Sequence, residues 1–365
     1  MRWASVLLVI VFLIAGLWWI DQAPPRLVPN IIYDDDCSYD VDCVLTLTTL
    51  HRWIDTGQVR VRAMVADAPN TGSAPVMRIW NVFFGHGAIP VGTYKGTNGT
   101  AGAGTGASTW TASEVSTFAT GDSGARYPDC VTVYRQALAA AGAGSVRIVA
   151  TGIESCLAAL LHSGADSISP LTGAQLVKQR VAGLYLMGGD YPTGAEYNLE
   201  TDPADAASVF NLWTSQNGFP PIYLFGFTEG NSVIVGPASR FPATNPAPYA
   251  LRVAGYANRP AWDQLALYGA VFSLRNFTLS ANGTNTVNAT TGANSFSAAV
   301  HSGHYYTSLA RSISFYEAML DGAANEGTNY FYPRAAPRGR ASYRRVGEST
   351  AIRVSVAEPA AGQGR

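Results

Sequence analysis

Five aspartates lie within nine residues near the start of the chain, directly after the strand-like run at 27–33. They are Asp34, Asp35, Asp36, Asp40 and Asp42. Carboxylates this dense repel one another unless a cation neutralises them. The hard ions Ca²⁺ and Mg²⁺ fit best, because no His or Cys cluster offers softer ligands at zinc spacing. The EF-hand pattern fails, since it needs a Gly at the sixth loop position and a Glu at the twelfth. The alternative is a solvated acidic loop whose aspartates cap a helix.

The elements that must position these acids alternate between strand and helix. Apolar runs predict strands, and amphipathic or capped segments between them predict helices. An α/β alternation of this length predicts a mostly parallel central sheet flanked by helices in a single domain. Ligand sites of such sheets lie at the carboxyl ends of strands, which is where the acids follow residue 33. The expected strands are 27–33, 59–65, 145–150, 181–187 and 221–227, and the expected helices are 41–53, 75–85, 155–162 and 203–216.

Three further segments differ from this pattern in composition. Residues 97–124 are rich in Gly, Ala, Ser and Thr and are expected to form a loop or lid insertion. Alternation in 276–297 predicts a hairpin. Residues 333–365 are rich in Arg, Pro and Ala and are expected to form a flexible tail, which leaves 26–332 as the main domain.

The first 25 residues are expected to act as a signal anchor or a signal peptide. Arg2 precedes an apolar run of 17 residues from Ala4 to Ile20. This run is at the short limit for a transmembrane helix and long for a signal-peptide core. Both alternatives place the body of the protein on the extracytoplasmic side, either membrane-anchored through residues 4–20 or secreted.

Composition excludes some partners. The formal net charge of -1 argues against nucleic acid, which calls for a basic face. The four cysteines have no metal-type spacing, and they can be buried thiols or up to two disulfides.

Five segments resemble, in order and spacing, the motifs of nucleoside hydrolases. The opening acids are similar to the branch pattern D-x-D-x-x-x-D-x-D-D, and Val146–Gly152 resembles the strand that ends in Thr-Gly. Met187-Gly188-Gly189 with 195–203 is similar to the "MGG … AEFN … DP" segment. Residues 226–230 resemble a "GxExG" strand end, and Asn258–Asp263 resembles "R-P-S-W-D".

The resemblance implies a hydrolase, an N-glycosidase of nucleoside metabolism that uses Ca²⁺. Asp36 would be the catalytic base, and the substrate would be a small nucleoside. A homo-oligomer is a possible state. The implied metal ligands are Asp36, Asp40, Asp42, the Thr151 carbonyl and Asp263, and the implied substrate contacts are Asp40, Asn70, Glu196, Asn198 and Trp262. As alternatives, Asp263 can be a helix N-cap, and Glu196 and Asn198 can cap a loop.

Two cysteines depart from the family pattern. Cys43 stands where the branch has a metal aspartate, and Cys156 stands where the Thr-Gly segment has an asparagine. A thiol is a poor Ca²⁺ ligand, so a non-catalytic nucleoside- or sugar-binding relative is the alternative function. Both positions are expected near the metal site, and we predict that Cys43 and Cys156 lie close enough to form a disulfide. The alternative is two separate buried thiols.

Overall fold

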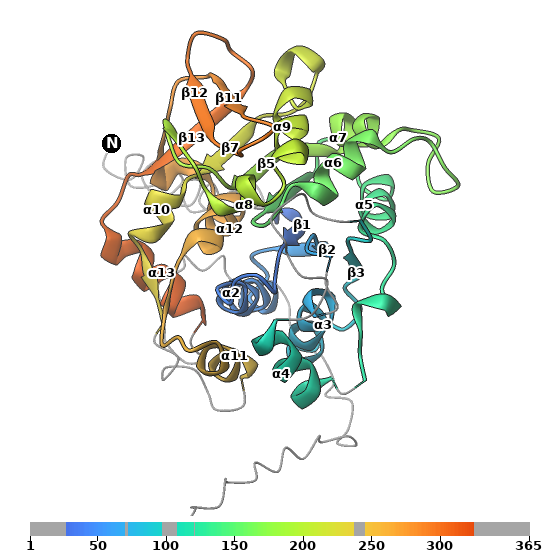
Figure 1. The fold of residues 1–365 in the computed structure, drawn as a ribbon, viewed down its shortest axis with the longest axis vertical. Helices are drawn as coiled ribbons and strands as arrows, with labels where there is room; N and C mark the ends of the chain where they lie inside the picture. Colours follow the sequence, from blue (N-terminus) through green and yellow to red (C-terminus); the bar gives the residue numbers. More distant parts are fainter. Residues whose placement is uncertain (1–26, 70–71, 97–107, 120, 237–244, 325–365) are drawn as a thin grey trace, which may run out of the picture. The chain divides into compact units, whose positions relative to one another are not determined.

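The computed structural model describes residues 27–69, 72–96, 108–119, 121–236 and 245–324. Its largest element is an eight-stranded sheet with the order β10-β13-β7-β5-β4-β1-β2-β3. All neighbours pair in parallel except β10 and β13, which are antiparallel. Helices cover both faces (Figure 1). The predicted α/β fold with a mostly parallel central sheet is confirmed. The sheet strands are β1 (Asn30–Asp35), β2 (Arg60–Ala66), β3 (Val91–Thr93), β4 (Val146–Ala150), β5 (Val181–Met187), β7 (Ile222–Phe225), β10 (Phe277–Leu279) and β13 (His304–Leu309).

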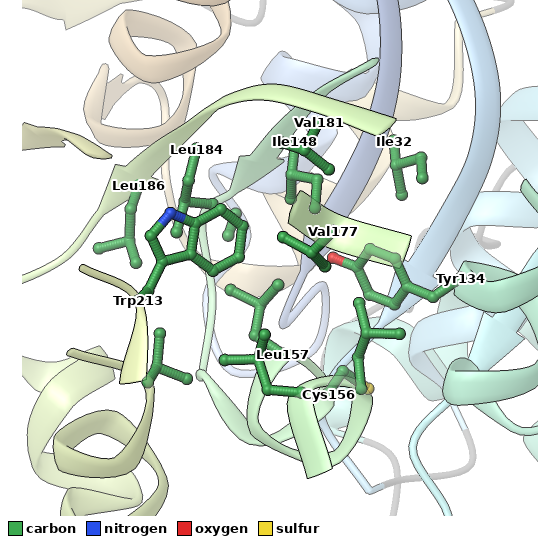
Figure 2. Packing of buried hydrophobic residues seen from close by; sticks show 14 of the residues in the cluster. Ile32, Tyr134, Ile148, Cys156, Leu157, Val177, Val181, Leu184, Leu186 and Trp213 are labelled. Carbon is green, nitrogen blue, oxygen red and sulfur yellow. The ribbon is translucent and has the colours of Figure 1, made fainter. Parts of the chain in front are cut away.

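The helices of one face share a single apolar core with the sheet. The strands contribute Ile32, Ile148 and Leu184 to this core, and the helical segments contribute Leu157 and Trp213 (Figure 2). Central strands of a parallel sheet are buried on both faces, which is why they are continuous apolar runs in the sequence. The helices of this face are α5 (Cys130–Ala139), α6 (Ser155–His162), α7 (Gly173–Arg180) and α9 (Pro203–Leu212).

The opposite face is covered by a second set of helices that contact one another. Here α12 packs against β4, β5 and β7, and α2 packs against α12 and α13. The set consists of α2 (Cys43–Asp55), α3 (Ser73–Phe83), α11 (Pro246–Ala254), α12 (Trp262–Phe272) and α13 (Ile313–Ala324). The remaining short elements are α8 (Tyr197–Thr201), α10 (Phe227–Asn231), β6 (Thr193–Gly194), β8 (Ile234–Val235) and β9 (Arg259–Pro260).

The order in which successive strands are added to the sheet reverses at β1. It runs from β1 outward to β2 and β3, then returns to place β4 on the other side of β1. Loops that leave β1 and β4 at their carboxyl ends therefore diverge to opposite sides, and this is the point where ligands bind in open α/β sheets.

Two expectations for insertions have different outcomes. The hairpin expected in 276–297 is confirmed, because β11 (Thr284–Val287) and β12 (Asn294–Ser297) pair in antiparallel. The expected loop at 97–124 is wrong for its second half, where α4 (Thr109–Phe118) forms. The Ser108 side chain caps α4 by accepting from the Thr111 amide, and Trp110 is buried. Capping and packing of α4 against α11 and α3 outweigh its weak helix propensity.

The predicted pairing of Cys43 with Cys156 is wrong. Cys43 bonds to Cys37 with a Cα separation of 5.4 Å, and Cys156 bonds to Cys130 at 6.1 Å. The reason is that Cys43 begins α2 on one face of the sheet, whereas Cys156 lies in the core of the other face. The alternative of two disulfides describes the chain.

The expected membrane anchor needs correction. Among the described helices, none has both the length and the apolar composition needed to cross a bilayer. The transmembrane and signal-anchor expectation, and the extracytoplasmic location built on it, therefore find no support in the described residues. The segment itself, residues 1–25, lies outside the described residues, as does the tail at 333–365.

Candidate active site

The end of β1 presents carboxylates to both faces of the sheet. Asp34, Asp35 and Asp36 are at most 5% exposed. Side chains alternate along a strand, so Asp34 points to the face of α5 and Asp35 to the face of α2. The Tyr134 hydroxyl donates to Asp34 Oδ2 at 2.5 Å, and the Tyr33 hydroxyl donates to Asp35 Oδ2.

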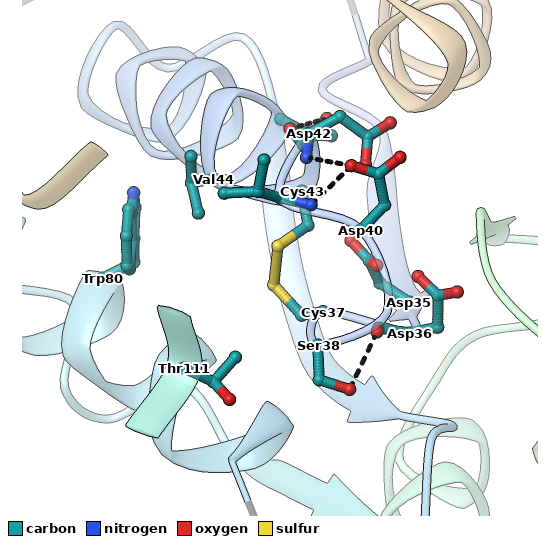
Figure 3. The surroundings of a disulfide bond; sticks show 12 residues. Asp35, Asp36, Cys37, Ser38, Asp40, Asp42, Cys43, Val44, Trp80 and Thr111 are labelled. Carbon is teal, nitrogen blue, oxygen red and sulfur yellow. Dashed lines mark hydrogen bonds between the residues drawn. A yellow bond between two sulfur atoms is a disulfide. The ribbon is translucent and has the colours of Figure 1, made fainter. Parts of the chain in front are cut away.

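The loop that follows β1 is closed by the Cys37–Cys43 disulfide. Figure 3 shows the acidic side chains gathered on one side of this bond. Asp40 Oδ1 accepts from the Val41 amide at 2.5 Å and from the Asp42 amide at 3.2 Å, and its Oδ2 accepts from Arg259. Both oxygens of Asp40 are thus engaged, so Asp40 helps the disulfide to hold the loop in shape.

Two buried aspartates approach this loop from helix starts. Asp42 precedes α2 and makes no side-chain cap, and it is 4% exposed. Asp263 is the second residue of α12, is 3% exposed, and has no hydrogen-bond partner for Oδ2 within the described residues. The N-cap of α12 is Ala261, so Asp263 does not serve as a cap.

The end of β4 contributes a backbone oxygen. The Thr151 carbonyl accepts from Asn198 Nδ2 at 3.2 Å, which leaves one lone pair of that carbonyl. Asn198 Nδ2 also contacts the Met187 carbonyl at 3.2 Å. Glu196 caps α8, because its carboxylate accepts from the amides of Asn198 and Leu199. The capping alternative therefore describes Glu196, which also accepts from the Gly189 amide at 2.9 Å.

Aromatic side chains accompany the acids. Trp262 stacks on Phe227 with centroids 5.3 Å apart, and the Arg259 guanidinium lies 5.1 Å from the Trp262 ring. Tyr197 is 54% exposed and contacts Tyr39 edge-on at 6.3 Å. Exposed aromatic faces next to carboxylates can stack on a planar nucleobase while the carboxylates bind a polar group.

The structure thus gathers at one end of the sheet all the sequence-predicted site residues that it describes. Asn70 is the exception, because it lies outside the described residues.

Burial dominates the electrostatics of this cluster. It raises the pKa of Asp35 to about 7, against the opposing hydrogen bond from Tyr33. It likewise raises the pKa of Asp34 to about 8 and that of Glu196 to about 7. The pKa values of Asp36, Asp42 and Asp263 lie well above the ordinary range through burial and through neighbouring carboxylates.

The donor set fits a hard divalent cation. Asp35 Oδ1 and Asp263 Oδ2 are buried oxygens without a hydrogen-bond partner in the described residues. An Asp35 oxygen and the Cys37 and Cys43 sulfurs also lie within 4.8 Å of one another. Both sulfurs are bonded to each other, so they offer no thiolate. Oxygen ligands alone remain, which suits Ca²⁺ or Mg²⁺.

Sequence reasoning missed two buried carboxylates at strand ends. Asp67 follows β2, and burial and the charge of Asp34 raise its pKa. Glu154 precedes α6, and burial and the charge of Glu196 raise its pKa. Both are at most 1% exposed. Neither belongs to a motif, and the available signal was a single acidic residue soon after an apolar strand.

Comparison with known proteins finds likeness only in three dimensions. No protein-family model matches the chain. No curated protein matches its sequence. A plant nucleoside hydrolase superposes with a TM-score of 0.61 at 15% identity, covering 82% of this chain and 99% of that one. An inosine-uridine preferring nucleoside hydrolase from Bacillus anthracis gives 0.58 at 14%, covering 81% and 99%.

A bacterial effector shares the same architecture. The type III effector protein XopQ, solved in complex with adenosine diphosphate ribose, gives a TM-score of 0.56 at 16% identity, covering 85% of this chain and 96% of that one. These likenesses establish the fold, which is that of the nucleoside hydrolases.

Proposed function

We propose that this protein hydrolyses the N-glycosidic bond of a ribonucleoside, or of a related ribosyl compound, with Ca²⁺ as its cofactor. One observation carries the proposal: buried carboxylates, some of whose oxygens have no hydrogen-bond partner among the described residues, converge at the strand-order reversal of a nucleoside hydrolase fold. Burying so many carboxylates together is costly unless a cation offsets their charge.

The residues that would hold the cation are Asp36, Asp42, Asp263 and the Thr151 carbonyl. Asp40 pairs with Arg259 and with two backbone amides, so it fits the role of holding Asp42 in place. When bound, a divalent cation supplies a water molecule of lowered pKa and orients it.

Asp36 is the base in this mechanism. Its carboxylate accepts the proton of the attacking water, a contribution worth roughly 10²–10⁴ in rate. Burial and the neighbouring Asp35 keep the pKa of Asp36 high in the metal-free protein. Asp36 therefore acts as a base only when cationic charge stabilises its ionised form.

The sugar and the nucleobase of the substrate would contact different residues. Glu196 and Asn198 are fixed by backbone contacts beside the Thr151 carbonyl, and they are suited to bind ribose hydroxyls. Trp262 and Tyr197 present aromatic faces on which the leaving base can stack. Bond cleavage passes through an oxocarbenium-like sugar, which the surrounding carboxylates stabilise electrostatically.

A second candidate is a non-catalytic binding protein for nucleosides or ribosyl nucleotides. The specific observation is the Cys37–Cys43 disulfide, which occupies a position where the resemblance implies a metal aspartate. The effector XopQ, which has a similar fold, was solved in complex with adenosine diphosphate ribose, which is a ligand of the class that this second candidate would bind.

One experiment separates the two candidates. The protein is incubated with Ca²⁺ and a panel of ribonucleosides plus adenosine diphosphate ribose, and both free ribose and binding heat are measured. Ribose release that the Asp36→Asn variant lacks supports the hydrolase. Binding without release, unchanged in that variant, supports the binding protein.

A further inference from the structure

The Cys43 side chain carries no oxygen, and its sulfur is bonded to Cys37, so it offers a cation neither a carboxylate nor a thiolate. The space beside this disulfide is instead reached by Asp35 from the end of β1. An Asp35 oxygen and both sulfurs lie within 4.8 Å of one another. Asp35 is 0% exposed, so its carboxylate faces the acidic cluster and not bulk water.

The two oxygens of Asp35 have different surroundings. Oδ2 accepts from the Tyr33 hydroxyl, which in turn lies 3.3 Å from Thr151 Oγ1. Oδ1 has no hydrogen-bond partner in the part of the chain that is described. Protein carboxylates that bind metals show this arrangement, in which an outer hydrogen bond fixes one oxygen and leaves the other for the ion.

After burial, the charge of Asp35 is the largest cause that raises the pKa of Asp36, so the two carboxyl groups are neighbours. Asp42 and Asp263 are also electrostatically coupled to Asp35. Asp35 therefore adjoins the residues that the proposed cation needs, although the family motif gives its position no role.

We propose that Asp35 is a further metal ligand, binding the cation through Oδ1 and supplying the oxygen that the disulfide-bonded Cys43 cannot. This inference rests on the proposed function, because it concerns the same cation. Tyr33 is the positioning residue that orients Asp35.

Asp34 offers a matched control on the same strand. It is equally buried, and a tyrosine hydroxyl, that of Tyr134, also donates to it. It points to the opposite face, toward Asp67. Its replacement by Asn changes the charge balance and hydrogen bonding of the cluster without removing the proposed ligand.

The test is Ca²⁺ titration by calorimetry at pH 7.5, with Asp35→Asn, Asp34→Asn and Tyr33→Phe beside the unaltered protein. We expect Asp35→Asn to weaken calcium binding by at least about 100-fold, and Tyr33→Phe by about 10–100-fold, as removal of an outer-shell partner does. Asp34→Asn should weaken calcium binding by less than about tenfold, because every proposed ligand is still present. Without metal, Asp35→Asn should melt no lower than the unaltered protein, since it removes a buried charge.

Three other results of the titration would each refute a specific claim. Calcium binding by Asp35→Asn within threefold of the unaltered protein overturns this inference and leaves the proposed metal site standing. Equal losses in Asp35→Asn and Asp34→Asn also overturn it, because charge alone would then explain the effect. No calcium binding by the unaltered protein overturns the metal-dependent function and this inference together. If Asp35→Asn does not fold, Tyr33→Phe decides, and unchanged affinity there refutes the role of Asp35.

Discussion

The stabilisation that calcium gives through the proposed site should depend steeply on pH. Asp36, Asp42 and Asp263 have pKa values raised by burial, and that of Asp35 is about 7. In the metal-free protein these carboxyls keep their protons until the pH rises past those values. Calcium binds the ionised forms, so it must displace the protons when the pH is lower.

The magnitude follows from proton competition. For each proton displaced from a group of pKa about 7, affinity falls about tenfold per pH unit below 7, which is about 1.4 kcal/mol. At pH 7 half of that group is already ionised, so between pH 7 and pH 5 one proton costs about 50-fold in affinity. Calcium at 100 times its Kd stabilises by about 2.7 kcal/mol at pH 7, and the same concentration stabilises by only about 0.6 kcal/mol at pH 5.

The assay is thermal melting from pH 5 to pH 8, with calcium and after its removal by a chelator. The difference between the two curves isolates the site, because groups outside it contribute equally to both. Glu114→Gln is the control, since burial in α4 raises the pKa of Glu114 to about 8 without involving the site. That variant should change the metal-free curve and leave the calcium increment unchanged. A calcium increment of equal size at pH 5 and pH 7 would refute the buried carboxylate site.

Three further predictions concern single features. Asp36→Asn should lower kcat at least about 100-fold with unchanged circular dichroism, and retention of a tenth of kcat would exclude the general-base role. Trp262→Ala, which removes the ring stacked on Phe227, should lower kcat/KM by about 2- to 13-fold if the base stacks there, and an unchanged value would exclude that contact. Replacing Cys130 and Cys156 by Ser should lower the free energy of unfolding in urea by about 3–4 kcal/mol, as expected for a closed loop of this length. A loss below about 1 kcal/mol would show that this bond is not formed.

The strands, and the position of the candidate site at the end of one of them, could be predicted from the sequence. Ile31, Ile32 and Tyr33 lie in a central strand buried on both faces, so they form an apolar run that no helix period interrupts. The acids follow this run directly, and the end of a parallel strand is a ligand-binding position in any such sheet.

The long-range partners could not be predicted. The two disulfides depend on which face of the sheet each helix covers, and a sequence does not state that for Cys43 and Cys156. Glu154 was missed because one acid after a strand has many uses, and only packing shows that it is buried beside Glu196. The helix α4 was missed because its Ser and Thr residues favour turns until Trp110 packs.

The most direct test of the proposed function is the release of free ribose from a ribonucleoside panel in the presence of Ca²⁺. We predict release with at least one nucleoside, lost on removal of calcium by a chelator and restored when calcium is added back. No release from any nucleoside at pH 7.5, by a protein that binds calcium and remains folded, would contradict the proposal that this site hydrolyses N-glycosidic bonds.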